Sequence, residues 1–173
     1  MRTAVGKGTV VQALKARHPE VWVSVSATTR PPRPTEIDGV HYHFVSNADF
    51  DVLVATDGLL EWATVHGRDR YGTPSAPVEA AVERGERVIL EIDLQGARQV
   101  RQRLPGARLV FIAPPNWAEL VNRLVGRGTE TAEQRERRLR TAQVELAAAD
   151  EFDHVVVNDD LGRAVDDLVS LLG

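Results

Sequence analysis

Short runs of apolar residues alternate along the chain with longer stretches in which apolar positions recur at helical spacing. The short runs, which predict strands, cover residues 22–26, 41–45, 59–63, 88–93, 109–113 and 154–158. The longer stretches, which predict helices, cover residues 9–17, 47–56, 76–84, 95–103, 117–125, 131–150 and 161–172. A regular alternation of strands and helices predicts an α/β fold with a parallel sheet and right-handed crossovers.

Local signals mark the ends of several predicted helices. His18-Pro19 stops the first helix, and Gly85 is expected to adopt the left-handed conformation that closes many helices. The run Thr131-Ala132-Glu133-Gln134 is typical of a capping box at a helix start.

Composition narrows the class of protein. With no cysteine, neither a disulfide nor a thiolate metal site is possible, so we expect a cytoplasmic protein. The net charge of -4 gives no general reason to bind nucleic acid or an anionic membrane, and no apolar run approaches a membrane span. The five histidines lack ligand spacing, so no structural metal is expected. Met1-Arg2-Thr3 leads directly into a Gly-Lys motif, and no signal peptide is expected.

The stretch Ala4-Val5-Gly6-Lys7-Gly8-Thr9 is a candidate phosphate site because it opens an apolar helix. Backbone N–H groups of a Gly-rich turn and a helix N-terminus bind phosphate oxygens, and a lysine neutralises the outer phosphates. A simple capped helix start is an equally good interpretation of this stretch alone.

The stretch departs from the P-loop pattern G-x-x-x-x-G-K-[ST] in three ways. Met1 stands where the first glycine belongs, Gly8 replaces the hydroxyl residue, and Thr9 comes one position late. Too few residues precede the motif to form the strand that feeds a P-loop, so we expect that the chain lacks its first, central strand.

Two arginines, Arg30 and Arg33, lie on a Pro-rich segment directly after the strand at 22–26. Prolines keep this segment extended at the carboxyl end of a strand, where α/β folds bind ligands. A solvated Pro-rich turn is the more frequent explanation of such a segment taken alone.

Carboxylates interrupt two apolar runs. Glu61 conflicts with the pattern around it, and such conflicts are often functional or lie on an edge strand. Glu91 and Asp93 are two positions apart and therefore share one face of their predicted strand.

The densest positive charge is Arg123, Arg127 and the group Arg135, Arg137 and Arg138. Arginines on a helix-loop-helix suit a lid over phosphates, because guanidinium groups match phosphate oxygens. A salt-bridged surface helix, with Glu133 and Arg137 at i,i+4, is the more frequent explanation of such charges taken alone.

Taken together, these residues resemble the guanylate kinase family over nearly the whole chain. The strings that carry the resemblance are VSATTRPPRP (25–34), GVHYHF (39–44), LLEWA (59–63), RYGT (70–73), LEIDLQG (90–96), FIAPP (111–115), GRGTET (126–131) and VVNDDL (156–161). The resemblance implies the nucleoside-monophosphate-kinase fold, with a P-loop and parallel core sheet with helices on both faces, a small GMP-binding lobe and a helical arginine lid. It places the core at residues 1–30, 75–122 and 145–173, the lobe at 31–74 and the lid at 123–144 of a single domain.

The resemblance also implies two nucleotide sites. The residues that match the phosphate site of GMP are Arg30, Arg33, Tyr42 and Tyr71. The residues that match the guanine site are Glu61 and Thr73, with Ser26 and Asp93 close by. A carboxylate accepts hydrogen bonds from the N1–H and N2 amine of guanine and finds neither on adenine, so Glu61 would select GMP.

On the ATP side, the residues that match the family are Ala4 to Thr9 with Lys7, the arginines Arg123, Arg127 and Arg138, and Asn158 near the adenine. Mg²⁺ is expected to arrive with ATP, with Thr9 as its candidate protein ligand. The implied reaction is MgATP + GMP to ADP + GDP, with dGMP as a further acceptor. Phosphoryl transfer mainly needs alignment and charge neutralisation, so no general base is expected.

Two alternatives stay open at this point. A non-catalytic module could use the lobe to bind GMP or a phosphorylated protein partner, which the shortened P-loop favours and the retained Lys7 and lid arginines oppose. A kinase for another monophosphate is opposed by Glu61 with Thr73. The sequence does not reveal the oligomeric state.

Overall fold

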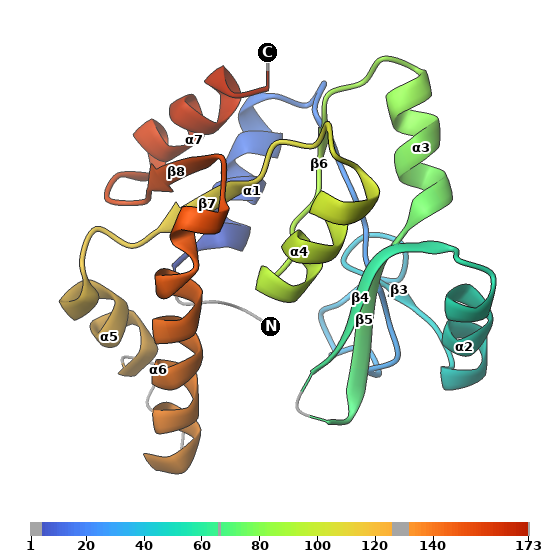
Figure 1. Cartoon of the computed structure of the whole chain (residues 1–173), viewed down its shortest axis with the longest axis horizontal. Helices are drawn as coiled ribbons and strands as arrows, with labels where there is room; N and C mark the ends of the chain where they lie inside the picture. The colour runs from blue at the N-terminus through green and yellow to red at the C-terminus, as the bar shows by residue number, and fades with distance from the viewer. Residues whose placement is uncertain (1–4, 66, 126–131, 173) are drawn as a thin grey trace. The chain divides into compact units, whose positions relative to one another are not determined.

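The computed structural model of the chain describes residues 5–65, 67–125 and 132–172. The chain divides into two compact units, Met1–His18 with Arg108–Gly173 as the first and Pro19–Ala107 as the second. In the described residues, seven α-helices alternate with eight strands, which confirms the predicted α/β class (Figure 1). The division into core, lobe and lid stays a prediction.

The first unit combines two parallel strands with four helices. Its elements are α1 (Lys7–Arg17), β7 (Val110–Ala113), α5 (Trp117–Val125), α6 (Ala132–Ala147), the 3₁₀ turn η1 (Ala149–Glu151), β8 (His154–Val157) and α7 (Leu161–Ser170). β7 pairs with β8 along its whole length, and α1 packs against α7. The fully buried Leu14 and Val165 are in the apolar faces of these two helices. Arg17 adds an ion pair with Asp166 at 2.5 Å. Helix α1 is thereby fixed to α7.

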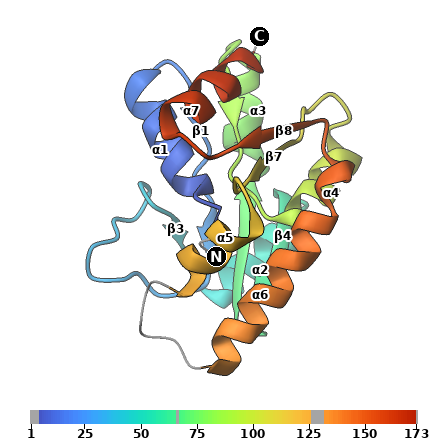
Figure 2. The ribbon, with the colours of Figure 1, turned by 90° about the vertical axis from the view of Figure 1, so that its left-hand side faces the viewer.

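The second unit contains a four-stranded sheet and a separate parallel pair. Its elements are β1 (Trp22–Val23), β2 (Ala27–Thr28), β3 (His43–Phe44), α2 (Asn47–Ala55), β4 (Leu59–Val65), β5 (Asp69–Pro74), α3 (Ser75–Glu83), β6 (Val88–Ile89) and α4 (Leu94–Arg103). β1 pairs with β6, and the larger sheet has the order β3-β2-β5-β4. Its small core is Ala27, Phe50 and Leu59. Figure 2 shows the long loop that leads into β3. Arg30 and Arg33 belong to this connection between β2 and β3.

Side chains of α4 cover the free edge of β4. Gln99 accepts a hydrogen bond from the backbone N–H of Trp62 at 3.1 Å and donates to its carbonyl at 2.8 Å. Arg103 donates to the carbonyl of Leu59 at 2.7 Å. The Gln99 side chain therefore makes the two backbone hydrogen bonds that a neighbouring strand would make, and it protects an otherwise exposed edge of the sheet.

Helix α2 is fixed to the sheet by Arg70 of β5. Its guanidinium bonds Asp51 at 2.6 Å and the carbonyl of Asn47 at 2.8 Å, and its central carbon lies 4.7 Å from the centre of the Phe50 ring. Ser46 begins the helix with a capping box that involves Asp49. Arg70 belongs to the string RYGT (70–73), which carries part of the family resemblance, but no role for Arg70 itself was predicted.

Most predicted helices are confirmed to within a few residues, and three predictions about the strands are wrong. Asp69–Pro74, where no strand was predicted, is strand β5, bonded to β4 on one side and β2 on the other. The strand expected at 22–26 divides into β1 and β2, which pair with different partners. The strand expected at 88–93 ends at Ile89, and Asp93 instead caps α4.

Helix ends follow the local signals. Gly85 has φ +74, as expected, and the N–H of Glu86 bonds the carbonyl of Ala81 at 3.0 Å, which closes α3. His18 is the C-cap of α1. Thr131 and the first part of its capping box lie outside the described residues. The structure contains no helix in its described part that is long and apolar enough to cross a membrane.

Candidate functional site

The guanine candidates Glu61 and Thr73 lie opposite each other in the β4–β5 ladder. The Thr73 hydroxyl donates to Glu61 Oε1 at 2.6 Å, and both residues are buried, at 0% and 7% exposure. Gly96, in the first turn of α4, lies so close that a Cβ there would be 2.5 Å from Glu61 Oε2. Backbone pairing, a hydroxyl and a glycine together fix the carboxylate of Glu61.

Ser26 and Asp93, expected near the guanine, belong to the same unit but differ in what they contact. The carboxylate of Asp93 accepts from the backbone N–H of Gly96 at 2.9 Å as the N-cap of α4. Ser26 precedes β2, and its carbonyl accepts from His43 at 2.9 Å. Asp93 and Glu61 therefore both lie next to Gly96. The position of Ser26 is set instead by the hydrogen bond between its carbonyl and the backbone of His43.

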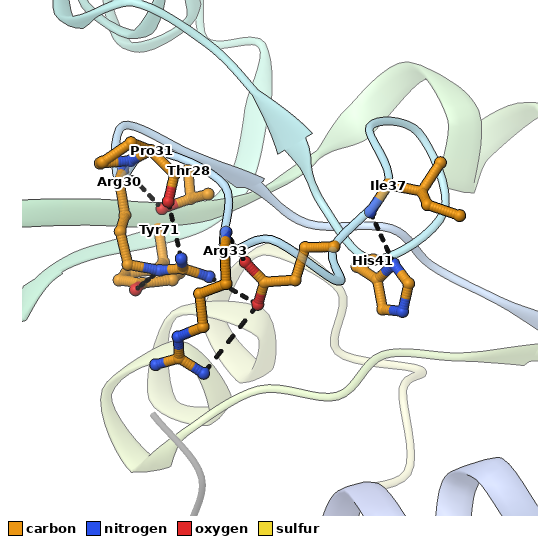
Figure 3. A network of polar contacts seen from close by, with 8 residues as sticks. Thr28, Arg30, Pro31, Arg33, Ile37, His41 and Tyr71 are labelled. Atoms are coloured by element: carbon orange, nitrogen blue, oxygen red, sulfur yellow. Dashed lines mark hydrogen bonds and ion pairs between the residues drawn. The ribbon is translucent and has the colours of Figure 1, made fainter.

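Arg30 lies near Arg33 and Tyr71, two further phosphate candidates (Figure 3). Arg30 Nε donates to the Tyr71 hydroxyl at 3.2 Å, and its guanidinium carbon lies 5.6 Å from the centre of the Tyr42 ring. The rings of Tyr42 and Tyr71 meet edge to face at 5.8 Å. Arg33 extends toward solvent with a side chain that is 64% exposed. Arg30 therefore contacts both phenols, and the role of these residues at the phosphate of GMP stays a prediction.

The charges of this cluster suit a bound anion. Burial alone lowers the pKa of Arg30, but hydrogen bonds with Glu36 and Tyr71 outweigh burial and leave that pKa raised. Burial, followed by the charges of Tyr71 and Glu91, raises the pKa of Tyr42. Arg30 is therefore a permanent cation and Tyr42 a phenol that can donate a hydrogen bond at neutral pH.

Glu36 is the residue of this cluster that the sequence analysis missed. Its carboxylate bonds Arg30 Nη2 at 2.9 Å and the backbone N–H of Arg33 at 2.7 Å. The sequence feature that could have indicated Glu36 is its position three residues after Arg33 on a Pro-rich turn.

The candidate phosphate loop leads into α1 in the first unit. Gly6, the N-cap, has φ +80, and no side chain caps this end of the helix. The N-terminal N–H groups of a long, uncapped helix favour an anion. Lys7 begins α1 and Gly8 and Thr9 complete its first turn, with Thr9 exposed. Ala4 lies outside the described residues.

Asn158 supports this loop directly. Its side-chain amide donates to the carbonyl of Val5 at 2.8 Å, and a Cβ on Gly6 would meet the same amide nitrogen at 2.5 Å. Asn158 is 8% exposed. The structure therefore gives Asn158 a contact with the loop itself.

Two of the three candidate lid arginines lie on helices that contact each other, Arg123 on α5 and Arg138 on α6. Arg123 bonds Glu119 at 3.0 Å and the carbonyl of Asn158 at 3.4 Å. Arg138 is half-buried on α6, and Arg127 lies outside the described residues. Arg123 is thus linked through Asn158 to the same loop as Lys7.

Comparison with known proteins confirms the family that the sequence resembles. The family model for guanylate kinase matches residues 2–173. The chain is 65% identical over 170 residues to a guanylate kinase of Cutibacterium acnes, covering 98% of this chain and 85% of that protein. It is 59% identical over 170 residues to one of Leifsonia xyli, covering 98% and 67%. A crystal structure of guanylate kinase from Anaplasma phagocytophilum superposes with a TM-score of 0.77 at 31% identity, covering 95% of this chain and 79% of that one.

Proposed function

The chain belongs to the guanylate kinase family of ATP:GMP phosphotransferases, and we propose how its residues divide the work of that reaction. The fold is the P-loop nucleoside-monophosphate-kinase type. The non-catalytic alternative is not favoured, since these relatives carry the name of the enzyme over nearly the whole chain.

Glu61 and Thr73 select guanine in this proposal. The observation that carries it is the buried carboxylate of Glu61, held by the Thr73 hydroxyl at 2.6 Å. One carboxylate accepts both N–H groups on the edge of guanine, whereas adenine has no N–H at N1 and no N2 amine. With AMP the buried carboxylate would keep its bond to Thr73 but lose both hydrogen bonds to the base, which disfavours AMP. Ser26 and Asp93 complete this end of the site.

Arg30, Arg33, Tyr42 and Tyr71 hold the phosphate of GMP. Guanidinium and phenol donors surround an anion on several sides, and the dianion itself is the nucleophile. The loop from Ala4 to Thr9 holds the β- and γ-phosphates of ATP, with the Lys7 ammonium on the outer oxygens. Arg123, Arg127 and Arg138 neutralise the charge that spreads over the transferred group.

Magnesium is expected to enter bound to ATP. A cation on phosphate oxygens keeps several waters and needs few protein ligands. Among the residues that the structure describes, no group of three or more His, Asp or Glu side chains could hold a metal, which is consistent with a site built mainly from phosphates. The exposed hydroxyl of Thr9 is the candidate protein ligand, and the cation there would neutralise phosphate charge. ATP and GMP are the expected partners, and a cytoplasmic location stays a prediction.

A coupled assay of ADP release tests this proposal. With MgATP as donor, GMP should support rapid turnover and dGMP slower turnover, while AMP and UMP should be poor acceptors. Comparable kcat/KM values for GMP and AMP would contradict the role of Glu61 and Thr73.

A further inference from the structure

Glu36 connects the two arginines of the phosphate cluster. One carboxylate oxygen accepts from Arg30 Nη2 at 2.9 Å, and the other accepts from the backbone N–H of Arg33 at 2.7 Å. The backbone N–H of Glu36 donates in turn to the carbonyl of Arg33 at 2.9 Å. The turn that carries Arg33 is therefore closed twice by Glu36, while the same side chain holds Arg30.

The guanidinium of Arg30 is held at all three nitrogens. Nε donates to Tyr71 at 3.2 Å, Nη1 to the carbonyl of Pro31 at 2.7 Å, and Nη2 to Glu36. A guanidinium has five N–H groups, so these bonds leave one on each Nη for an incoming anion. The orientation of those two donors depends on Glu36.

Exposure differs sharply across this group. The side chains of Arg30 and Glu36 are 14% and 12% exposed, and their ion pair is therefore partly shielded from water. The Arg33 side chain is 64% exposed, and its Nη1 lies 4.0 Å from Glu36 Oε1. Arg30 is thus fixed in advance, whereas Arg33 is held by its backbone with its charged end in solvent.

We propose that Glu36 is a positioning residue that orients Arg30 and the Arg33 turn to bind the phosphate of GMP. This inference rests on the proposed assignment of the two arginines to that phosphate. A carboxylate next to a dianion is repulsive, so two opposite effects compete when Glu36 is removed. Binding weakens if the orientation of the arginines dominates, and it tightens if the repulsion dominates.

The sign of that change is measurable. Calorimetric titration should compare Glu36→Gln and Glu36→Ala with wild type, using GMP and guanosine as separate ligands. We expect both variants to bind GMP at least about tenfold more weakly and guanosine unchanged, because guanosine has no phosphate to orient. In the steady state, KM for GMP should rise while KM for ATP and kcat stay close to wild type. Glu79→Ala, at an exposed glutamate of α3, is the matched control and should change none of these values.

Two results would overturn the inference. Tighter GMP binding in Glu36→Gln would make the carboxylate an internal competitor for the phosphate site. An equal loss for GMP and guanosine would give Glu36 only a structural role in the unit. Arg30→Ala and Arg33→Ala complete the series. If these two variants leave GMP binding unchanged, the assignment of the phosphate site itself is wrong. If they weaken GMP binding while the Glu36 variants do not, the assignment of the site stands and the inference about Glu36 fails.

Discussion

Thr73 lies directly across the β4–β5 ladder from Glu61 and donates its hydroxyl hydrogen to the Glu61 carboxylate at 2.6 Å. Neither residue is exposed enough for water to replace this bond easily. The bond leaves acceptor capacity on the carboxylate for a ligand, since an ionised carboxylate has about four lone-pair positions.

Removal of the Thr73 hydroxyl should therefore weaken the recognition of GMP. A hydrogen bond to a charged group contributes about 1.5–3 kcal/mol, so Thr73→Val should lower kcat/KM for GMP by about 10- to 100-fold. Thr73→Ser keeps the hydroxyl and is the control, with kcat/KM close to wild type. The coupled ADP assay measures both. Equal activity of the valine and serine variants would contradict the role of this hydroxyl.

Gly96→Ala should displace the carboxylate of Glu61, because Gly96 lies next to Oε2 whereas Thr73 bonds Oε1. Alanine is better than glycine in a helix by about 1 kcal/mol, so α4 by itself would gain stability. A Cβ at position 96 would be only 2.5 Å from Glu61 Oε2, so the carboxylate must move. We expect KM for GMP to rise about tenfold or more while KM for ATP changes little. An unchanged KM for GMP would show that the position of Glu61 does not matter for binding.

Lys7→Met should lower kcat by about 10²- to 10³-fold, the usual effect of losing one group that stabilises transition-state charge. GMP binding, measured by calorimetry, should be retained because Lys7 is assigned to ATP. Lys15→Met, an exposed change on the same helix, should leave kcat close to wild type. Loss of GMP affinity in Lys7→Met would indicate a general folding defect.

Gly6→Ala should disrupt the phosphate loop. Position 6 has φ +80, and an added Cβ would meet the side-chain nitrogen of Asn158 at 2.5 Å. We expect a several-fold or larger rise in KM for ATP and a loss of stability of about 1–3 kcal/mol, measured by denaturant unfolding. Gly106→Ala is the control, because its Cβ would meet no heavy atom within 4 Å.

Asn158→Ala should loosen the same loop by removing its bond to the Val5 carbonyl. The expected result is again a rise in KM for ATP, with KM for GMP unchanged. If KM for ATP stays the same in Asn158→Ala, its contact with the loop does not support ATP binding.

The stability of the phosphate cluster should depend on acid pH. The backbone N–H of Arg33, and then Arg30, lower the pKa of Glu36 below its ordinary value of 4.5, although burial opposes this. The contribution of Glu36 to folding is therefore complete above the unfolded pKa and is lost as pH falls through the folded pKa. The Tm difference between wild type and Glu36→Gln should be constant near neutral pH and shrink below about pH 4.5. A difference that stays constant down to pH 3 would contradict the ion pair.

How far the sequence anticipated the fold depends on the range of the interactions involved. Helix α5 was expected at the residues where it occurs, because apolar spacing is a local property. Strand β5 was missed because Asp69–Pro74 has no apolar alternation and contains Gly72 and Pro74. It is a strand because β2 and β4 bond it on both sides, and such pairing overrides local preference.

The residue types that the chemistry needs can be read from the amino-acid sequence alone: a Gly-Lys turn before a helix, two arginines on a stiff segment, and a carboxylate within an apolar run. The partners of these residues depend on how the chain folds. Thr73 faces Glu61 across a hairpin, Glu36 bonds Arg30 from the far end of a turn, and Asn158 reaches Val5 across 153 positions. Local spacing cannot specify these contacts, because each depends on how separate strands, turns and helices pack together.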